Sequence, residues 1–450
     1  MNTPDLTTES SVEHSLEWAA TERLEALYRA DSRPWVVAFS GGKDSTVVLQ
    51  LVFRILLKLG AEATKPVIVL SSDTQVEAPN VAAFVHDTLQ RIHTEAQALG
   101  LPLVTQLVKP RPEEGYWGKV IGKGYPPPTR WFRWCTSSMK IRPSRRAVDD
   151  ITRHYGSVIL LLGTRISESS QRGRTMQART LNSKGLNPHH EIPNALVAAP
   201  IADWDTDDVW EYLASGICPW GGDHRFLFSL YRQASGGECP VVFDMSTPSC
   251  GGSRFGCWTC TVVKQDKSMQ GFIRSGEEQF QPLADFRDRL MDLREQSSMR
   301  SDVKRNGLSG PGPFLPAARQ QILNELLELE QKVGFPVITD EELLYIQSEW
   351  NNEFDFQGSL ALEVAAQHGR VISMNRQNDS KAFQSKQEND LLEQAALEAE
   401  VNPDLLRNLM ELRQRDYPSL DKWGAKSAFE RAIGELVRKA AIQEEEAVQS

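Results

Sequence analysis

Short apolar runs alternate with helical spacings over the first 160 residues. Four of these runs predict buried strands: Trp35–Phe39, Val67–Leu70, Leu103–Val108 and Val158–Leu162. Between the first two strands, apolar residues recur every three or four positions up to Leu59, and Gly60 is a natural end for that helix. Strands separated by helices of this length are typical of parallel βαβ units. The pattern therefore predicts an α/β fold with a doubly wound, mostly parallel sheet.

Changes in this pattern predict how the chain is organised. The segment from Lys109 to Thr136 is rich in glycine and proline and is expected to be a long loop. The pattern becomes irregular between Cys218 and Met269, and helical periodicity dominates after Gly310. Five regions are predicted: an N-terminal helical segment (1–30), the α/β domain (31–215), a Cys-rich subdomain (216–275), a helical region (276–375), and a linker with a C-terminal helical segment (376–450).

Composition narrows the class of protein. The chain has 450 residues, of which 40% are hydrophobic and 24% are charged, as in a soluble globular protein. It shows neither a secretory signal pattern nor an apolar run long enough for a membrane helix, so we expect a cytoplasmic protein without membrane contact. A net charge of −10 argues against a surface that is basic everywhere. The segment from Arg130 to Arg146 nevertheless carries six basic residues, three aromatic residues and no acidic residue.

The turn after the first predicted strand carries the clearest chemical signal. It reads "SGGKDS" from Ser40 to Ser45, and a helix begins within it. Gly41 and Gly42 let the backbone approach a ligand closely, while the helix N-terminus and Lys43 supply positive charge. Ligands of open α/β sheets bind at the carboxyl ends of the strands, where this turn lies. The turn therefore predicts a pyrophosphate-binding site.

The order of residues in this turn resembles the PP-loop of the ATP pyrophosphatase superfamily. It differs from the P-loop of common NTPases, because Val37 replaces a required glycine and Asp44 follows the lysine. The segments "VLSSDTQVEAP", "WCTSSMKIRP", "LLGTRISESSQR" and "PIADWDTDDVWEYL" resemble the sulfonucleotide reductase branch. The resemblance implies an adenine nucleotide alpha hydrolase-like domain that splits ATP between its α and β phosphates with Mg²⁺. It also implies a set of nucleotide-binding residues, of which Lys43 and Asp44 are catalytic: Ser40, Gly41, Gly42, Lys43, Asp44, Ser45, Asp73, Gly163 and Arg165.

Four cysteines lie close together in the Cys-rich subdomain. Cys239, Cys250, Cys257 and Cys260 have the spacing C-x10-C-x6-C-x2-C. A Cys-x2-Cys pair can hold a metal from a single turn, and two further thiols complete a tetrahedral set. The spacing fits structural zinc and a [4Fe–4S] cluster equally.

The segment "RFGCWTCTVVKQDKSM" and the four-cysteine spacing resemble the DndC subunits of bacterial DNA phosphorothioation systems. The resemblance covers about residues 33–275. It implies a [4Fe–4S] cluster held by Cys239, Cys250, Cys257 and Cys260. Cys135 lies apart, inside the basic aromatic segment. There we expect neighbouring cations to lower the pKa of its thiol, and we interpret it as a catalytic, sulfur-handling residue.

The resulting hypothesis is an ATP-dependent sulfurtransferase. It adenylates a DNA backbone phosphate oxygen, releases pyrophosphate and replaces the activated oxygen with sulfur. A cysteine desulfurase would supply the sulfur, and other phosphorothioation subunits would help to hold the DNA. The alternatives are a phosphoadenylylsulfate reductase-like enzyme, a tRNA thiolase and a non-catalytic nucleotide-sensing scaffold. Reductases of this kind use a cysteine near the C-terminus, whereas no cysteine follows Cys260 in this chain.

Overall fold

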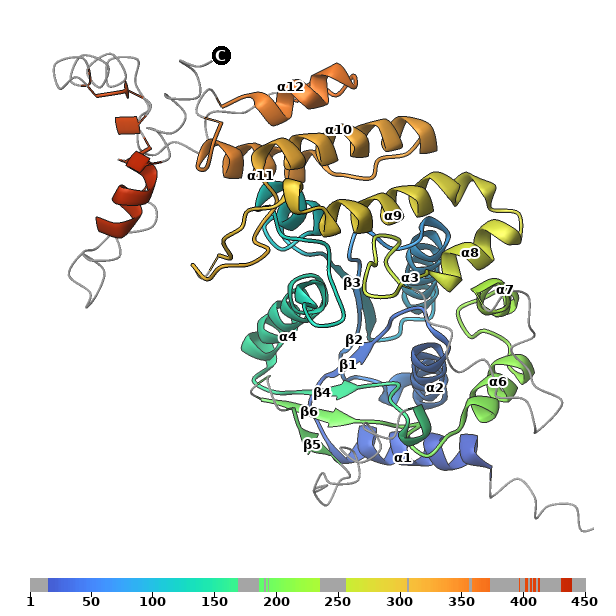
Figure 1. Ribbon diagram of the computed structural model, residues 1–450. Coiled ribbons are helices and arrows are strands. Elements are labelled where there is room, and N and C mark those ends of the chain that lie inside the picture. The colour runs from blue at the N-terminus through green and yellow to red at the C-terminus, as the bar shows by residue number, and fades with distance from the viewer. Residues whose placement is uncertain are drawn as a thin grey trace, which may run out of the picture. The chain divides into compact units, whose positions relative to one another are not determined.

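The computed structural model describes residues 15–168, 186–189, 192, 194–234, 256–305, 307–355, 358–372, 396, 401–403, 405–406, 408–409, 412 and 430–438. The chain divides into two compact units, residues 1–345 and 346–450. Figure 1 shows the sheet and its helices in the first unit. None of the helices in the described ranges is long and apolar enough to span a membrane.

Six strands of the first unit form one sheet in the order β3-β2-β1-β4-β6-β5. The strands are β1 (Trp35–Ala38), β2 (Val67–Ser72), β3 (Leu103–Val108), β4 (Val158–Leu161), β5 (Asn187–Pro188) and β6 (Ala195–Ala198). Neighbouring strands from β3 to β6 are parallel, and β5 pairs antiparallel with β6. The predicted α/β fold with a mostly parallel sheet is confirmed.

The helices are α1 (Leu16–Ala30), α2 (Lys43–Leu59), α3 (Pro79–Ala98), α4 (Arg142–Tyr155), α6 (Thr206–Ser215), α7 (Arg225–Ala234), α8 (Lys267–Arg274), α9 (Gln281–Glu295), α10 (Pro316–Val333), α11 (Asp340–Asn351) and α12 (Leu360–Gln367). Two π-helical turns, Gly118–Gly122 and Thr136–Ile141, lie between β3 and α4. Short 3-10 turns occur at Gly60–Glu62, Ile166–Glu168, Glu278–Phe280 and Ser297–Met299.

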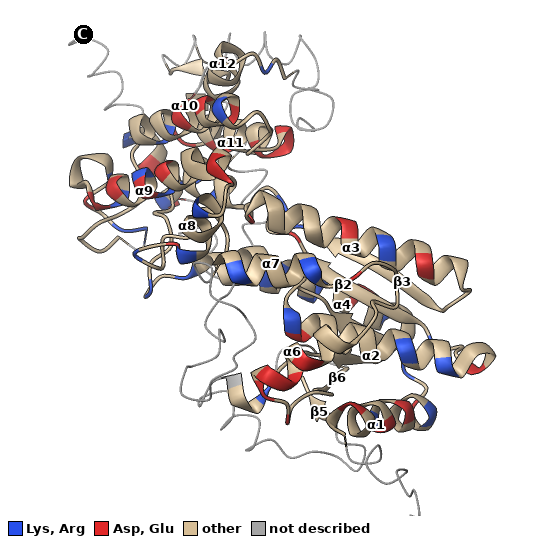
Figure 2. Cartoon of the chain, turned by 90° about the vertical axis from the view of Figure 1, so that its right-hand side faces the viewer, with Lys and Arg blue, Asp and Glu red and all other residues tan. Residues whose placement is uncertain are grey.

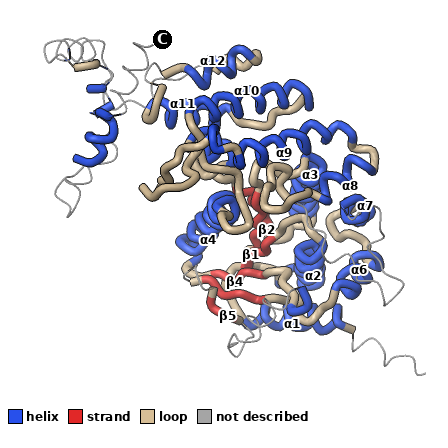
Figure 3. The backbone as a smooth tube through the Cα atoms, viewed as in Figure 1, coloured by secondary structure: helices blue, strands red, loops and turns tan. Residues whose placement is uncertain are grey.

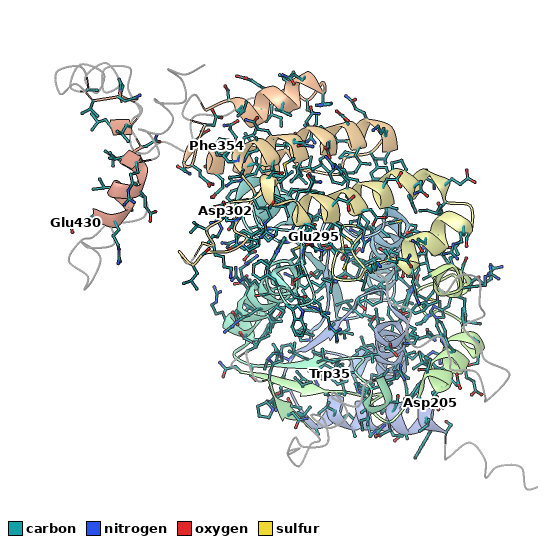
Figure 4. The ribbon with its side chains drawn as sticks, viewed as in Figure 1. Trp35, Asp205, Glu295, Asp302, Phe354 and Glu430 are labelled. Atoms are coloured by element: carbon teal, nitrogen blue, oxygen red, sulfur yellow. The ribbon has the colours of Figure 1, made fainter. Side chains whose placement is uncertain are left out.

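Helices cover both faces of the sheet because side chains along a strand point alternately to opposite sides. Trp35 and Val37 of β1 belong to the core shared with α1, α2 and α6, whereas Val36 belongs to the core shared with α4. Figure 3 shows the strands between α2 and α4. Trp35 is completely buried and meets the Tyr28 ring edge-on at 5.1 Å (Figure 4). Because β1 is packed on both faces, the position of its C-terminal end, where the glycine turn begins, is well defined.

The sequence pattern did not predict helix α7 or the strands β5 and β6. We predicted an irregular chain from Cys218 to Met269, but α7 is a regular helix within it. Its buried residues Leu227, Leu230, Tyr231 and Ala234 have helical spacing, which the surrounding glycines and prolines obscured. Strands β5 and β6 were also missed, because β5 has only 2 residues and β6 has 4. The capping box at Asp205 begins α6 (Figure 4).

The second unit contains a small polar core around Gln347. Its side-chain oxygen accepts hydrogen bonds from the N–H groups of Ala361 and Leu362. Its amide nitrogen donates to Asp355 at 2.7 Å, and Asp355 in turn accepts from Leu360. These bonds satisfy N–H groups at the start of α12 that have no partner within the helix.

Glu342, at the start of α11, makes the stability of the first unit depend on pH. Burial raises the pKa of its carboxyl from 4.5 to about 7. The folded protein therefore keeps this proton over a range in which the unfolded chain loses it, so the free energy of unfolding falls as pH rises from 4.5 to about 7. The loss is about 3 kcal/mol at 1.36 kcal/mol per pKa unit.

We expect Glu342→Gln to remove this slope and to stabilise the protein above pH 7. Urea unfolding followed by tryptophan fluorescence at several pH values measures the effect. The matched control is Glu341→Gln, because Glu341 is the exposed neighbour on the same helix. A Glu342→Gln protein that keeps the wild-type pH dependence would contradict the assignment.

Candidate functional site

The glycine turn lies between the end of β1 and the start of α2, as the sequence predicts. Gly41 has a φ of 72°, a left-handed conformation that favours glycine. Gly42 is the N-cap of α2, and no side chain caps the helix there. The Ser40 and Ser45 hydroxyls are 3.1 Å apart, and the Ser45 hydroxyl donates to the Gly42 carbonyl oxygen at 2.9 Å. The turn thus presents a helix N-terminus and two serine hydroxyls at the edge of the sheet.

This turn lines a cavity of about 750 Å³. The cavity lies at the carboxyl ends of β1, β2 and β4, whose last residues and following loops form its walls. The predicted nucleotide-binding residues that line it are Ser40, Gly42, Lys43, Asp44, Ser45, Asp73 and Gly163. The structure therefore brings these residues from three separate strand ends into one concave site, where ligands of α/β sheets bind.

A chain of ion pairs fixes the two charged residues of the turn. The Lys43 ammonium lies 2.8 Å from one oxygen of Asp44, and Arg165 Nε lies 2.6 Å from the other. Arg165 is only 1% exposed and also donates hydrogen bonds to Ser167 and Thr206. Arg165 is not among the residues that line the cavity. It therefore acts on the cavity indirectly, by holding Asp44.

Gly163 is needed because β4 ends against the start of α2. A Cβ atom there would lie 2.8 Å from the backbone carbonyl carbon and oxygen of Asp44 and 2.9 Å from the Ser45 nitrogen. These are backbone atoms, so any larger residue would have to displace the glycine turn itself. Gly163 thus sets the position of the turn in the cavity wall.

Sequence reasoning missed Tyr231 as a site residue. Its hydroxyl accepts a hydrogen bond from the Lys43 backbone N–H at 3.2 Å. The Lys43 ammonium also lies 5.9 Å from the centre of the Tyr231 ring. Tyr231 comes from α7, so the helical spacing hidden in the Cys-rich subdomain was the signal that could have found it. The Tyr231 hydroxyl thus accepts from a backbone N–H group of the helix N-terminus that could otherwise donate to a phosphate oxygen.

Acidic and basic side chains gather on the opposite wall. Asp73 lies 3.4 Å from His86 and 3.7 Å from Lys109. Burial, with a further contribution from the nearby Asp73, raises the pKa of Glu77 to about 7. Asp73, Glu77, His86 and Lys140 all line the cavity. This wall can therefore bind a cation or exchange protons near neutral pH.

The Cys-x2-Cys turn lies directly behind this wall. Cys257 forms a backbone bridge with Glu77, and its sulfur is 3.5 Å from the Thr74 hydroxyl. The backbone N–H of Cys260 donates to the Cys257 carbonyl oxygen at 2.9 Å. Arg287 of α9, which is 3% exposed, donates to the Cys260 carbonyl oxygen at 2.9 Å. These contacts join the thiol pair to the loop between β2 and α3.

Cys135 lies near the same pair, but its thiol is not activated as predicted. Burial, together with the nearby Cys260, raises its pKa, so the expectation that cations lower this pKa is wrong. The physical reason is that the thiol is partly buried, which disfavours the charged thiolate, whereas Arg133 and Lys140 are exposed to solvent. Burial and then the charges of Cys135, Cys260 and Cys257 raise the pKa of Tyr116. The Tyr116 hydroxyl donates to the carbonyl oxygen of Thr259, which lies within the Cys-x2-Cys turn, at 3.3 Å.

The thiol pair fits two positions of a sulfur-ligated metal site. Its two sulfurs come from one hydrogen-bonded turn, and Tyr116 and Trp258 bury the surroundings. Cys239 and Cys250, the other two predicted ligands, lie outside the described residues. Within the described ranges, no three His, Cys, Asp or Glu side chains are placed to hold a metal ion.

Two solved structures are similar to part of this chain. Phosphoadenylyl-sulfate (PAPS) reductase from Candida auris, in a phosphate complex, covers 48% of this chain and 89% of its own chain, with 18% identity and a TM-score of 0.29. FMN adenylyltransferase of Candida glabrata, solved with FMN and an ATP analogue, covers 54% of this chain and 74% of its own, with 13% identity and a TM-score of 0.30.

Two relatives are uncharacterized proteins of Methanocaldococcus jannaschii. Uncharacterized protein MJ0066 is 28% identical over 241 residues, which is 54% of this chain and 39% of the relative. Uncharacterized protein MJ0973 is 28% identical over 176 residues, 39% of this chain and 34% of the relative. The matched segments thus span less than half the length of either relative.

The family comparison agrees with the geometry of the cavity. The profile of the phosphoadenosine phosphosulfate reductase domain matches residues 34–263, which include the glycine turn, the cavity walls and the Cys-x2-Cys turn. This match covers slightly more than half of the chain. The chain belongs to the phosphoadenosine phosphosulfate reductase domain family.

Proposed function

We propose that this protein is an ATP-dependent sulfurtransferase that cleaves ATP at the glycine turn and replaces an oxygen of a DNA backbone phosphate with sulfur. The observation that carries the proposal is the contact between the cavity and the thiols. Thr74 follows Asp73 of the cavity wall, and its hydroxyl is 3.5 Å from the Cys257 sulfur. The thiol pair therefore lies next to the wall of the cavity in which ATP would bind, so that nucleotide activation and sulfur chemistry can take place side by side.

The glycine turn supplies what pyrophosphate binding needs. The β and γ phosphates would lie at the N-terminus of α2, facing its backbone N–H groups, the Ser40 and Ser45 hydroxyls and Lys43. Arg165 keeps Asp44 in place beside Lys43. Mg²⁺ fits the donor set of the opposite wall, because Asp73 and Glu77 are oxygen ligands and the phosphates would supply most of the coordination.

The first chemical step would be attack of a non-bridging phosphate oxygen of DNA on the α-phosphorus of ATP. The bond between the α-phosphorus and the bridging oxygen breaks, and pyrophosphate leaves. Because an anion attacks an anion, the reaction needs positive charge and oriented N–H groups near the phosphates. Lys43 and the start of α2 provide both. The acceptor phosphate then carries AMP, which is a good leaving group.

The second step would transfer sulfur through Cys135. A cysteine desulfurase would load this thiol as a persulfide, whose terminal sulfur attacks the activated phosphorus as AMP leaves. A thiol reductant then cleaves the sulfur–sulfur bond and releases the phosphorothioate. The position of Cys135 supports its role as the sulfur carrier, whereas its pKa does not. Cys135 lies near Cys260 and precedes the π-helical turn that leads to Lys140 in the cavity wall.

A [4Fe–4S] cluster remains part of the proposal, with Cys239, Cys250, Cys257 and Cys260 as its ligands. Such a cluster supplies electron transfer or a structural thiolate anchor. The Cys257–Cys260 turn would hold it next to the loop that carries Asp73. Other phosphorothioation subunits would assist in holding the DNA.

The test is the fate of ³⁵S in a reaction with cysteine, a cysteine desulfurase, ATP and duplex DNA. We expect ATP-dependent ³⁵S in nuclease-resistant dinucleotides. Sulfur in tRNA bases would instead establish a tRNA thiolase, and sulfite from phosphoadenylyl sulfate would establish a reductase. DNA without sulfur when all components are present would contradict the proposal.

Tyr231→Phe should tighten ATP binding. The nucleotide must displace the Tyr231 hydroxyl from the Lys43 N–H, and the phenylalanine has no hydroxyl to displace. One hydrogen bond of about 1 kcal/mol predicts a roughly fivefold lower Kd for ATP. Isothermal titration calorimetry measures the Kd for ATP. The control is Tyr155→Phe, because Tyr155 is an exposed residue at the end of α4. Weaker binding of ATP would mean that the hydroxyl contacts the nucleotide directly.

A further inference from the structure

The loop between β3 and α4 displays an exposed tryptophan on a tight turn. Thr129 and Phe132 exchange backbone hydrogen bonds at 3.2 Å, and the Thr129 hydroxyl accepts a third from Phe132. Arg130 and Trp131 occupy the tip of this turn, and Trp131 is 92% exposed. We use the term basic aromatic ridge for Arg130, Trp131, Phe132, Arg133 and Arg142.

The turn is anchored firmly on the protein. The Trp134 indole is buried and donates to the Pro126 carbonyl oxygen at 3.0 Å. The Pro128 carbonyl oxygen accepts from Thr261 at 2.7 Å and from Arg294 at 3.0 Å. An exposed tryptophan on such a fixed support loses little conformational entropy when it binds a partner.

The ring of Phe132 is positioned in the same way. It stacks on Tyr125 with a 15° angle between the planes and a centroid distance of 6.2 Å. Two cations also lie over the Tyr125 ring, Lys119 at 5.2 Å and Arg305 at 4.9 Å from its centre. Phe132 is 44% exposed, so part of the ring remains available beside Trp131.

The arginines of the ridge are not paired with carboxylates in the part of the chain that the structure describes. Arg130, Arg133 and Arg142 are exposed, and none of them forms a salt bridge with a carboxylate of the described residues. The Arg130 guanidinium lies 5.9 Å from the Trp131 ring. On α1, α3 and α9, by contrast, basic and acidic residues are interspersed (Figure 2). Exposed arginines beside exposed aromatic rings match the alternating phosphates and bases of a nucleic-acid strand.

The ridge continues into the cavity. The π-helical turn Thr136–Ile141 lies in sequence between Arg133 and Arg142 of the ridge, and Lys140, Ile141 and Arg145 line the cavity. A nucleic-acid strand bound to the ridge would therefore lead toward the cavity, where Lys140 and Arg145 could attract its phosphates. Cys135 lies in sequence between Arg133 of the ridge and these cavity residues.

We propose that the basic aromatic ridge binds a single strand of DNA, with one base stacked on Trp131 and phosphates held by Arg130, Arg133 and Arg142. The choice of DNA rests on the proposed function. Stacking requires an unpaired base, so the substrate would be a locally opened duplex. This gives the chain its own DNA-contacting surface.

The experiment measures binding of a fluorescent 20-nucleotide single-stranded DNA to the full chain by anisotropy, without ATP, over a range of salt concentrations. We expect Trp131→Ala to raise the Kd about tenfold. We expect Arg142→Ala to lower the slope of log K against log salt by about 0.7. Trp18→Ala on α1 and Arg153→Ala at the end of α4 are the matched controls, because both residues are exposed but lie outside the ridge.

The outcomes separate this inference from the proposed function, because binding is measured without catalysis. Wild-type binding that depends on Trp131 supports the ridge even if ATP is never cleaved. Equal binding by Trp131→Ala and Trp18→Ala overturns the ridge even if sulfur transfer occurs. Duplex DNA that binds more tightly than the single strand overturns base stacking, and an RNA strand that binds tenfold more tightly overturns the assignment to DNA.

Discussion

Lys43→Ala should lower the formation of AMP and pyrophosphate by about 10²- to 10³-fold, the cost of losing one group that stabilises developing charge. Lys43 is the cation of the glycine turn, and its ammonium lies beside Asp44 in the cavity wall. The fold should survive, because Arg165 continues to hold Asp44 after the change. Quenched-flow measurement of labelled AMP, together with the melting temperature, separates catalysis from stability.

The control for this prediction is Lys58→Ala. Lys58 lies in the last turn of the same helix and pairs with Glu25 on the surface. We expect it to keep wild-type turnover. A Lys43→Ala protein that still supports DNA modification at the normal rate would show that the glycine turn does not catalyse the reaction, and a scaffold role would then explain the cavity.

Cys135→Ser should abolish sulfur incorporation while pyrophosphate is still formed and AMP stays attached to the DNA phosphate. The proposal gives Cys135 the sulfur, and this residue does not line the cavity in which ATP would bind. Serine keeps the size of the side chain but cannot carry a persulfide. The measurement combines ³⁵S incorporation with the rate of pyrophosphate release on the same protein. Cys218→Ala is the control, because Cys218 is a buried thiol on a separate cavity.

The iron content of the same variant provides a second readout. If Cys239, Cys250, Cys257 and Cys260 are the ligands, Cys135→Ser should retain wild-type iron and sulfide, whereas Cys257→Ser should lose both. Loss of iron from Cys135→Ser would make Cys135 a ligand and remove its role as sulfur carrier. Its position near Cys260 makes this a sharp test.

The sequence was sufficient for the parts of the molecule that depend on local pattern. The four apolar runs became β1 to β4. For β1, β2 and β4 the reason is that a central parallel strand is buried on both faces and needs apolar residues, whereas β3 is the edge strand and is less buried. The glycine turn was predicted because a strand, two glycines and a helix start are contiguous in the chain. Its place in a cavity followed from the general position of ligands in α/β sheets.

Features that depend on distant residues could not be predicted. Arg165 supports Asp44 across 121 positions, and no local pattern distinguishes this role from direct nucleotide contact. The pKa of Cys135 depends on which neighbours are buried with it, and sequence proximity to Arg133 gave the wrong direction. The hydrogen bond between Tyr231 and the Lys43 N–H required α7, which the glycines and cysteines around it concealed.

The central claim is that ATP is split between its α and β phosphates at the glycine turn. The direct measurement supplies the wild-type protein with ATP labelled separately on the α and γ phosphates, together with DNA, cysteine, a cysteine desulfurase and a thiol reductant, and identifies the labelled products by chromatography. The account predicts that the α label appears in AMP and the γ label in pyrophosphate. Recovery of the α label in ADP and the γ label in inorganic phosphate would contradict it.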